Sequence, residues 1–440
     1  MAATENPAAA VPGTPAHSQS FGYELTALLL LGLAYGFAFF DRQALVYLGP
    51  QVQRDLGLSN EQLGFANSGL SLTWALGAYF IGRWSDTIGR RKPFLIGALV
   101  LFSACSVFSG LAWSFGTLLA ARIIMGLAEG PFLPICLAII AAASAESRRG
   151  LNSGIVQNSF GSILGNALAP FVLVRIAVAY GWQGAFYIAG VPGLVLALLV
   201  WRFVKEPERN DVSAREAGPR KRFTWAGVPQ RIVDETKVMG RFLAERNIAL
   251  CSLVSCCAVG SIVIGSIFMQ TYIEGPLGYD PITRANIMFV VGFCPAVGGV
   301  LVTWLSDKIG RKPPLVFFAF LMALLPAALL WFRGPVEILT ILMFVSWVGL
   351  GIFPLFMGVI PGETLGRARA ATAMGIVVMI GELTGGVFGP PVAGRLADYF
   401  GLDVALYIQG GLALLAGMIA LFVVETNPRV LARRHGGIAA

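Results

Sequence analysis

Long runs of apolar residues alternate with short polar stretches along almost the whole chain. We count about twelve runs of the roughly 20 residues that a helix needs to cross a bilayer, near residues 24–47, 63–82, 94–113, 116–143, 151–176, 184–204, 248–273, 284–304, 314–332, 336–359, 371–396 and 404–424. The runs are continuous and do not alternate residue by residue, so they predict helices rather than barrel strands. We therefore expect an all-α membrane protein with twelve transmembrane helices.

One charged loop occurs twice in this pattern. Residues 82–92 (GRWSDTIGRRK) and residues 304–312 (WLSDKIGRK) each join two apolar runs, and the spacing between Asp86 and Asp307 is called the repeat offset below. The same offset relates further glycines and prolines: Gly57 to Gly278, Gly77 to Gly298, Gly89 to Gly310, Gly154 to Gly375, Gly165 to Gly386 and Pro170 to Pro391. A duplication of this kind predicts two pseudo-symmetric six-helix bundles, an architecture that membrane transporters use.

The predicted bundles occupy residues 22–204 and 247–425, and a polar segment separates them. Residues 205–246 mix acids, bases and prolines, which indicates a cytoplasmic linker, and residues 223–242 could form an amphipathic helix on the membrane surface. We expect residues 1–21, rich in Ala, Pro and Ser, to be a disordered cytoplasmic tail without a cleaved signal peptide. Residues 426–440 are expected to form a cytoplasmic C-terminal tail.

Composition supports a membrane location and indicates an orientation. The chain of 440 residues is 56% hydrophobic and 13% charged, whereas a soluble protein carries about 25% charged residues. If twelve spans alternate, the basic residues between them gather on one side, which the positive-inside rule makes cytoplasmic: Arg90, Arg91, Lys92, Arg148, Arg149, Lys308, Arg311, Lys312, Arg367, Arg369, Arg429, Arg433 and Arg434. We therefore expect an inner-membrane protein with both termini in the cytoplasm. This placement explains the net charge of +8 without a nucleic-acid partner.

Cysteine and histidine offer no metal or redox site. All six cysteines fall within apolar runs, and the two histidines, His17 and His435, lie in the predicted tails. No spacing matches a metal-ligand set, so we expect buried free thiols and neither metal nor cofactor. No nucleophile–base pair is visible either, which argues against an enzyme.

A charge inside a span costs at least about 2.5–3.5 kcal/mol, and five charges within the predicted spans are the first candidates for a functional role: Asp41, Arg42, Arg122, Glu129 and Glu382. Arg42 could clamp a substrate carboxylate with its two-pronged guanidinium, or it could pair structurally with Asp41. Glu129, near the midplane, could carry the coupled proton or remain in a fixed ion pair. Asp41 could be the counter-ion of Arg42 or a second proton site.

The remaining two charges also allow more than one interpretation. Arg122 precedes Glu129 by nearly two helical turns, so both share a helix face and Arg122 could orient the glutamate or simply pack. Glu382 could be a proton site, a substrate-specificity residue or an acid hydrogen-bonded to a neighbouring helix. The repeat offset places uncharged residues opposite four of the charges: Val263 opposite Arg42, Met343 opposite Arg122, Leu350 opposite Glu129 and Gly161 opposite Glu382.

Uncharged polar residues and a few outer charges widen the candidate site. The weaker candidates for contact with substrate could equally serve as hydrogen bonds between helices: Gln157, Asn158, Gln270, Tyr272 and Glu274. At the cytoplasmic rim, four charges of the repeated loop could pair and hold a gate closed: Asp86, Arg90, Asp307 and Arg311.

The repeated loop resembles the signature of the major facilitator superfamily. The first copy reads Gly82-x3-Asp86-x2-Gly89-Arg90-x-Lys92, and the second copy departs from it with Thr303 at the leading glycine position. The resemblance covers about residues 20–425, the whole region of predicted spans. It implies twelve helices, a central linker and transport activity.

Two finer motifs resemble one branch, the anion:cation symporter family. They are Phe39-Phe40-Asp41-Arg42 in the first predicted span and Arg122-x3-Gly126-Leu127-Ala128-Glu129-Gly130 in the fourth. This resemblance implies an organic carboxylate as substrate, often with proton coupling. Related aromatic-acid:proton symporters carry a further acid near the position of Leu45, and none stands here.

One departure from the branch bears on the substrate. Many sugar-acid carriers follow an Asn-Ser pair in the fifth span with a glutamine, whereas here Asn158-Ser159 is followed by Phe160-Gly161. This difference favours less hydroxylated or aromatic carboxylates. We therefore expect a monomeric carrier that imports an organic mono- or dicarboxylate with protons; exchange, facilitated diffusion and a transporter-like membrane sensor are the alternatives.

Overall fold

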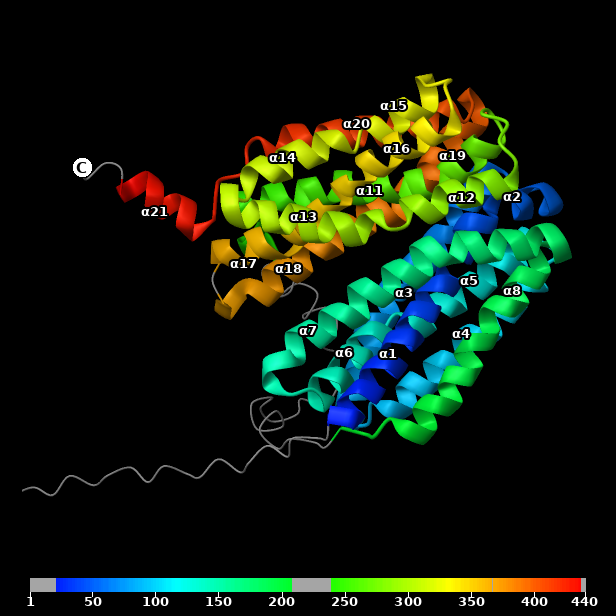
Figure 1. Cartoon of the computed structure of the whole chain (residues 1–440), viewed down its shortest axis with the longest axis horizontal. Helices are drawn as coiled ribbons and strands as arrows, with labels where there is room; N and C mark the ends of the chain where they lie inside the picture. The colour runs from blue at the N-terminus through cyan, green and yellow to red at the C-terminus, as the bar shows by residue number, and fades with distance from the viewer. Residues whose placement is uncertain (1–20, 208–238, 366, 437–440) are drawn as a thin grey trace, which may run out of the picture.

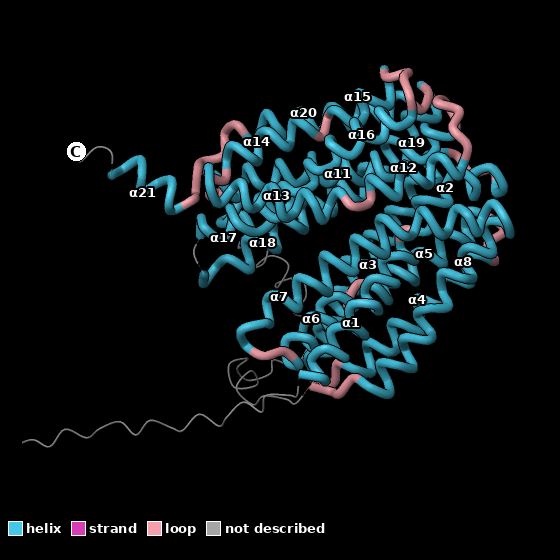
Figure 2. The backbone as a smooth tube through the Cα atoms, viewed as in Figure 1, coloured by secondary structure: helices cyan, strands magenta, loops and turns pink. Residues whose placement is uncertain are grey.

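The computed structural model describes residues 21–207, 239–365 and 367–436. Within these ranges the regular elements are helices, and no strand occurs (Figure 2). The predicted N-terminal tail, apart from residue 21, lies outside the described residues. So do most of the predicted linker and most of its predicted surface helix.

The first half of the chain folds into eight consecutive labelled helices (Figure 1). Some of these helices follow one another end to end and form longer helical stretches. They are α1 (Phe21–Arg42), α2 (Ala44–Leu56), α3 (Asn60–Ile88), α4 (Lys92–Gly110), α5 (Phe115–Glu129), α6 (Phe132–Ala143), α7 (Arg149–Gly154) and α8 (Ala169–Phe203). A short turn of helix, Glu146–Arg148, precedes α7, and a wider π-helical segment, Ile155–Leu168, joins α7 to α8.

The second half has the same general course. Its helices are α11 (Arg246–Glu274), α12 (Pro281–Val291), α13 (Cys294–Ile309), α14 (Lys312–Leu321), α15 (Leu324–Trp331), α16 (Val336–Trp347), α17 (Ile360–Leu365), α18 (Arg367–Gly381), α19 (Gly389–Phe400), α20 (Asp403–Ala420) and α21 (Pro428–Gly436). Shorter helical segments connect some of them: Val348–Ile352, Leu355–Val359 and Glu382–Phe388.

Ten stretches of the described residues are long and apolar enough to span a bilayer. One of them, Arg149–Phe203, has 55 residues, and its backbone leaves the helical conformation at Gly181 (φ 79°, ψ 159°). The long helix α3 is not among the ten. If Gly181 divides the long stretch and α3 also crosses, the number becomes twelve, so the predicted count stays a prediction.

The sequence repeat is present in the backbone itself. The positive-φ residues of the described chain are all glycines, and they form three pairs: Gly57 and Gly278, Gly89 and Gly310, Gly181 and Gly401. The first two pairs keep the repeat offset, and the third falls one position short of it. The two halves therefore turn their backbones at equivalent places.

Helix caps and helix crossings follow the same repeat. Ser59 caps α3 with its side chain, and the equivalent residue of the second half, Asp280, caps α12. Gly77 packs on the backbone of Leu127, and its equivalent, Gly298, packs on Val348, which is itself equivalent to Leu127. The two halves therefore bend and cross their helices alike.

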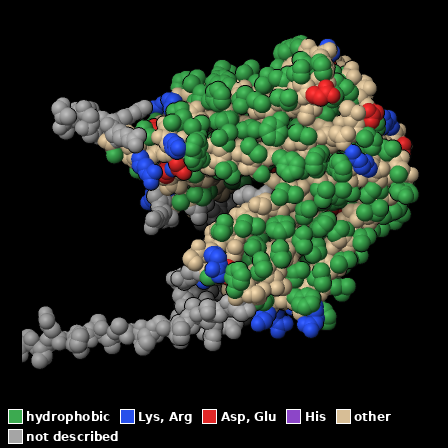
Figure 3. Space-filling model, viewed as in Figure 1, with side chains coloured by type: hydrophobic (Ala, Val, Ile, Leu, Met, Phe, Trp, Pro, Cys, Tyr) green, Lys and Arg blue, Asp and Glu red, His purple; other side chains and the backbone are tan. Residues whose placement is uncertain are grey.

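The two halves form separate bodies that meet at one end. Figure 1 shows α1–α8 and α11–α20 touching beside α2 and α12 and diverging toward α7, α17 and α18. At the touching end Arg175 donates to the Asn286 side chain (2.7 Å), and the rings of Phe171 and Phe289 lie 5.1 Å apart. Figure 3 shows the wedge at the other end, with lysine and arginine side chains at the ends of both bodies beside it.

Candidate functional site

A cavity of about 360 Å³ lies between the two halves and is lined by residues of both. The first half lines it with Phe39, Arg42, Gln43, Val46, Tyr47, Asn67, Leu70, Ser71, Trp74 and Asn166. The second half lines it with Ile262, Val263, Ser266, Ile267, Met269, Met288, Val291, Gly292, Pro295, Trp347, Leu350 and Glu382. A pocket shared by two repeat-related bundles is the place where transporters of this architecture bind substrate.

The cavity is built from repeat-related positions. Many lining residues form pairs at the repeat offset: Arg42 and Val263, Val46 and Ile267, Asn67 and Met288, Leu70 and Val291, Ser71 and Gly292, Trp74 and Pro295. The duplicated scaffold therefore presents the same places on both walls. The side chains at these places differ, because the polar members stand in the first half.

Arg42 is the cation of this cavity. It ends α1, and its guanidinium lies 5.1 Å from the ring centre of Trp74 on α3, a cation–π contact. No described residue forms an ion pair with Arg42. Its predicted structural pairing with Asp41 is not seen, because Asp41 accepts a hydrogen bond from Ser106 instead (2.6 Å). The guanidinium is thus held from one face while its N–H groups remain available to an anion.

A second group of charges is buried inside the first bundle. Asp41, Arg122 and Glu129 are 0%, 1% and 5% exposed. Ser106 bridges Asp41 to the carbonyl of Phe186 (2.9 Å), and the Arg122 guanidinium lies 5.2 Å from the Phe186 ring centre. Several polar atoms here have no hydrogen-bond partner among the described residues: Asp41 Oδ2, Arg122 Nε and Nη2, and Glu129 Oε1.

Unpartnered buried atoms are expensive, at about 1–3 kcal/mol each and more when charged. The fold nevertheless keeps Asp41, Arg122 and Glu129 buried with these atoms unpartnered, and such groups in a native structure call for an explanation. Arg122 and Glu129, which were predicted to share a helix face, are both buried on α5, and Asp41 lies within electrostatic reach of both. Glu129 and Glu382 both lie within electrostatic reach of Arg42. The charge of the buried group and the charge of the cavity cation therefore interact.

Close helix packing brings Glu382 to the cavity from the second half. Gly381 packs against the Ser255 side chain, and Gly385 packs against the backbone of Gly260, so the segment Glu382–Phe388 lies directly on α11. A side chain at either glycine would separate the two helices. Glu382 consequently lines the cavity from the second half, while Arg42 lines it from the first.

The polar residues at the outer end of α11 lie elsewhere than predicted. Gln270 is fully buried and accepts a hydrogen bond from Arg284 (2.7 Å), and Glu274 accepts another from Arg284 (2.7 Å). Arg54 of the first half reaches Glu274 at 3.1 Å and ties the two bodies together. Tyr272 is 2% exposed, lies in the hydrophobic core and does not line the cavity. We therefore drop Tyr272 and Gln270 as substrate contacts.

The sequence prediction missed Arg284, although a signal was available. Arg284 stands at the first position of the apolar run predicted near residues 284–304, and it is 0% exposed in the structure. A charge at the end of an apolar run marks the boundary of a span as readily as it marks a buried group. Its partners lie on other turns and helices, so only the tertiary structure identifies them.

The fifth predicted span contributes a different residue from those expected. Gln157 is exposed and does not line the cavity, and the side chain of Asn158 lies outside the described part of the structure. Asn166 lines it instead, accepting from the Gln43 side chain (3.3 Å) and, at its carbonyl, from the Tyr47 hydroxyl (3.2 Å). Phe160 packs against Gly32 of α1 and is not among the lining residues. The substrate argument based on Phe160 therefore loses its structural basis.

The repeated loop is held by a carboxylate that the sequence prediction also missed. In the second half, Glu425 accepts from the backbone N–H of Arg311 (2.8 Å) and of Lys312 (3.1 Å) at the start of α14. In the first half, Glu206 accepts from the N–H groups of Arg91 and Lys92 (3.0 Å for Lys92) at the start of α4. The available signal was the spacing of the two glutamates, which is close to the repeat offset.

The predicted gate residues are only partly described. Arg311 forms an ion pair with Asp307 and another with Glu363 (2.8 Å), all within the second half. Arg90 is exposed, and the side chain of Asp86 lies outside the described residues. Glu425 is outside the candidate spans, and although burial alone would raise its pKa, the backbone N–H donors lower it overall. The role of these charges as a gate stays a prediction.

The fold and the shared cavity define a multi-pass membrane transporter. Residues 31–384 match the family model of the Major Facilitator Superfamily, and the chain belongs to that family. A hexuronate transporter of Bacillus subtilis (strain 168) is 26% identical over 91% of this chain and 95% of its own. The 4-hydroxybenzoate transporter PcaK of Pseudomonas putida is 24% identical over 89% of this chain and 91% of its own.

The solved structures agree on the fold. The crystal structure of the nucleoside transporter NupG superimposes with a TM-score of 0.73 over 91% of this chain and 99% of that one, at 15% sequence identity. At this identity the likeness concerns the arrangement of helices alone. The predicted fold class and the prediction that the chain is not an enzyme are confirmed, and the relatives transport organic acids according to their names.

Proposed function

We propose that this protein imports an organic carboxylate together with protons by alternating access. The observation that supports this most directly is Arg42, a cavity guanidinium that Trp74 holds and that no described acid neutralises. A carboxylate can take both oxygens to such a fork, and the low-dielectric surroundings strengthen the attraction. Relatives named for hexuronate and 4-hydroxybenzoate support an organic acid as substrate.

Proton coupling is assigned to the buried group behind the cavity. Protonation of Glu129, and of Asp41 beside it, removes negative charge that otherwise competes with the substrate for Arg42. Arg122 keeps the two carboxyls oriented. Glu382 contacts the substrate from the opposite wall of the cavity. Substrate and proton then stabilise each other's bound state, which is the thermodynamic requirement for symport.

The conformation fits the release step of such a cycle. The basic ends beside the wedge would be cytoplasmic by the positive-inside rule, so the wedge opens inward in an inner membrane with both termini in the cytoplasm. The opposite end is closed by Arg54 on Glu274 and by Arg175 on Asn286. Outward opening requires these contacts to break, while Asp86, Arg90, Asp307 and Arg311 come together at the inner rim. The carrier acts as a monomer without a cofactor.

Uptake into proteoliposomes tests the proposal. Radiolabelled carboxylates are offered to the purified protein with and without an inward proton gradient, and wild type is compared with Glu129→Gln and with the exposed control Glu337→Gln. We expect gradient-driven accumulation in wild type and the control. Glu129→Gln should lose accumulation and keep exchange between preloaded vesicles.

Two outcomes would redirect the assignment. Full accumulation by Glu129→Gln would move the proton site to Asp41 or Glu382. Uptake that ignores the gradient in wild type would leave an exchanger or a uniporter. That alternative is favoured by one observation: neither Asp41 nor Glu129 lines the cavity.

A further inference from the structure

We infer that the substrate carries a single negative charge on a compact apolar body, a ring or a branched chain with few hydroxyl groups. This inference rests on the proposed function, because it specifies the carboxylate that the cavity would carry. It excludes dicarboxylates and polyhydroxy acids, both of which the sequence left open. The argument comes from the walls of the cavity, from its charge and from its size.

The two walls differ at positions that the repeat makes equivalent. Where the first half presents Arg42, Asn67 and Ser71, the second half presents Val263, Met288 and Gly292. The remaining pairs are apolar or aromatic in both halves, apart from the indole N–H of Trp74. The duplication thus supplies a control within one molecule: the paired positions share their geometry, but at these positions the polar side chains stand on the first-half wall.

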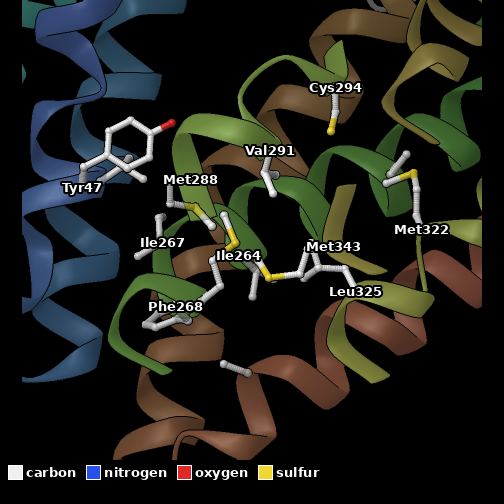
Figure 4. Close-up of a cluster of buried hydrophobic side chains, with 14 of the residues drawn as sticks. Tyr47, Ile264, Ile267, Phe268, Met288, Val291, Cys294, Met322, Leu325 and Met343 are labelled. Carbon is white, nitrogen blue, oxygen red and sulfur yellow. The ribbon is translucent and has the colours of Figure 1, made fainter. Parts of the chain in front are cut away.

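The apolar wall is continuous. Figure 4 shows Met288 of α12 between Ile267 of α11 and Val291 of α12, with Tyr47 of α2 on the first-half side of this cluster. Trp347 and Leu350 extend this wall, and Ser266 and Glu382 are its polar exceptions. Met288 also accepts a hydrogen bond from the buried amide of Gln270 (3.1 Å), which holds its thioether in place. A substrate anchored at Arg42 therefore turns its other end toward hydrocarbon.

Hydroxyl groups on that end would lose their hydrogen bonds to water and find few partners. Even on the polar wall, several groups are already engaged: Asn67 donates to the carbonyl of Leu63 (2.9 Å), and Ser71 donates to the carbonyl of Asn67 (3.2 Å). Burying a polar group without a partner disfavours binding by roughly tenfold or more for each group. A sugar acid, with hydroxyls on every face, is therefore rejected.

The charge of the cavity admits one carboxylate. Among the described residues that line it, Arg42 is the only lysine or arginine and Glu382 is the only acid. A second substrate carboxylate would lie without a cation and toward Glu382. An unpaired charge in such surroundings is far more costly than an unpaired hydroxyl. The cavity volume of about 360 Å³ is near the lower end of the range for small-molecule sites, about 300–1,000 Å³. A cavity of this size suits a substrate with one ring.

The test is a substrate panel in proteoliposomes containing the full-length protein. Uptake is measured for benzoate and cyclohexanecarboxylate, for terephthalate, which adds a second carboxylate across the ring, and for galacturonate, which replaces the apolar ring with hydroxyls. Benzamide, which lacks the charge, is added in excess as a control for competition. We expect the two ring monocarboxylates to exceed terephthalate and galacturonate by at least about tenfold in kcat/KM, with no competition from benzamide.

Variants at the repeat-related positions sharpen the result. Val263→Lys places a cation at the position equivalent to Arg42 and should raise terephthalate uptake relative to benzoate, whereas Val263→Leu, which adds bulk without charge, should not raise it. Met288→Asn restores the amide found at the equivalent position of the first half and should narrow the gap between benzoate and galacturonate. Met288→Asn keeps this test available if the charged variant does not fold.

The outcomes separate the two levels of the proposal. Preference for terephthalate or galacturonate over benzoate in wild type overturns this inference and leaves carboxylate transport intact. Transport of none of the carboxylates overturns the proposed function and this inference with it. Unchanged ratios in folded Val263→Lys and Met288→Asn would contradict the assignment of selectivity to the apolar wall.

Discussion

The N-terminal and C-terminal halves share a scaffold and divide the chemistry between them. In the first half the unmatched charges Asp41, Arg42, Arg122 and Glu129 gather at and behind the cavity. The equivalent positions of the second half are occupied by Ile262, Val263, Met343 and Leu350. In the second half the buried charges Glu274 and Arg284 gather at the closed end, and Leu63 stands opposite Arg284 in the first half.

This difference shows which features the two halves kept in common after duplication and which features occur in only one half. Paired glycines, helix caps and helix crossings are kept because both bundles must bend and pack alike. The charges at and behind the cavity and at the closed end are not repeated, whereas those of the repeated loops and the carboxylates that hold them are. Buried charges are also expensive, which favours a single copy of each. The predictions below test this division, beginning with the largest effect.

Loss of Arg284 should have the largest effect on stability. Arg284→Ala leaves Glu274 buried without its fully buried partner, and removing one member of a buried pair costs about 3–5 kcal/mol. Thermal unfolding in detergent should show a clear drop in Tm. The control is Arg54→Gln, because the Arg54 side chain is 62% exposed, and exposed ion pairs contribute only about 0–1 kcal/mol. Equal drops in Tm for both variants would contradict a stabilising role of the buried pair of Arg284 and Glu274.

Loss of Arg42 should affect binding rather than folding. Arg42→Ala removes the cavity cation and should cost about 2–5 kcal/mol of carboxylate affinity, at least about 30-fold in Kd. Arg42→Lys keeps the charge but not the planar fork, and it should recover only part of the loss. Ligand-dependent thermal stabilisation measures both. Arg333→Ala at an exposed outer position is the control, and normal affinity in Arg42→Ala would exclude the clamp.

Removal of the Ser106 hydroxyl should uncouple protons with a smaller energetic effect. Ser106→Ala deletes the 2.6 Å hydrogen bond to Asp41, and bonds to charged groups contribute about 1.5–3 kcal/mol. We expect the pH dependence of uptake to shift while exchange survives. Ser109→Ala is the matched control, because Ser109 donates only to the Cys105 carbonyl of its own helix (2.8 Å). The same pH profile in all three proteins would argue against a role for Asp41 in coupling.

The smallest effect should come from the carboxylates that hold the repeated loops. Glu425 has a lowered pKa, so its charged form stabilises the folded state above the ordinary glutamate pKa, and this contribution is lost as pH falls through its lowered folded value. Glu425→Gln should cost about 0.3–1 kcal/mol at pH 7. The difference from wild type should shrink in acid. A difference that grows in acid would contradict the sign of the Glu425 shift. Glu206→Gln should also destabilise the protein at pH 7, because it removes the equivalent bonds to the N–H groups of Arg91 and Lys92.

Periodicity and spacing were sufficient for the scaffold. Runs of about 20 apolar residues can only be satisfied as helices in a bilayer. A single offset shared by Gly57, Gly77 and Gly89 required a duplicated fold, and the paired φ values bear it out. Charges within spans pointed to Arg42 and Glu382, because few positions tolerate their cost. Both line the cavity.

The contacts between the halves could not be deduced in this way. Tyr272 and Gln270 share a helix with cavity residues, yet both are buried and neither lines the cavity. Their direction depends on how α11 rotates against its neighbours, and a polar residue in a span can equally serve a helix–helix hydrogen bond. Phe160 similarly fills a space beside Gly32.

By itself the sequence determined that this chain is a duplicated helical membrane transporter, with a cation in a predicted span of one half that the other half lacks. Placing polar groups in hydrocarbon is costly, so each segment of the chain shows by its own composition whether it can cross a bilayer. Composition, run length and spacing therefore suffice for this conclusion. Only the tertiary structure decided which residues meet: Trp74 beneath Arg42, Ser106 on Asp41, Arg284 on Glu274, and Val263 in the cavity with Arg42. These contacts join helices far apart in sequence, and helix rotation and bundle docking, which leave no periodic signal, set them.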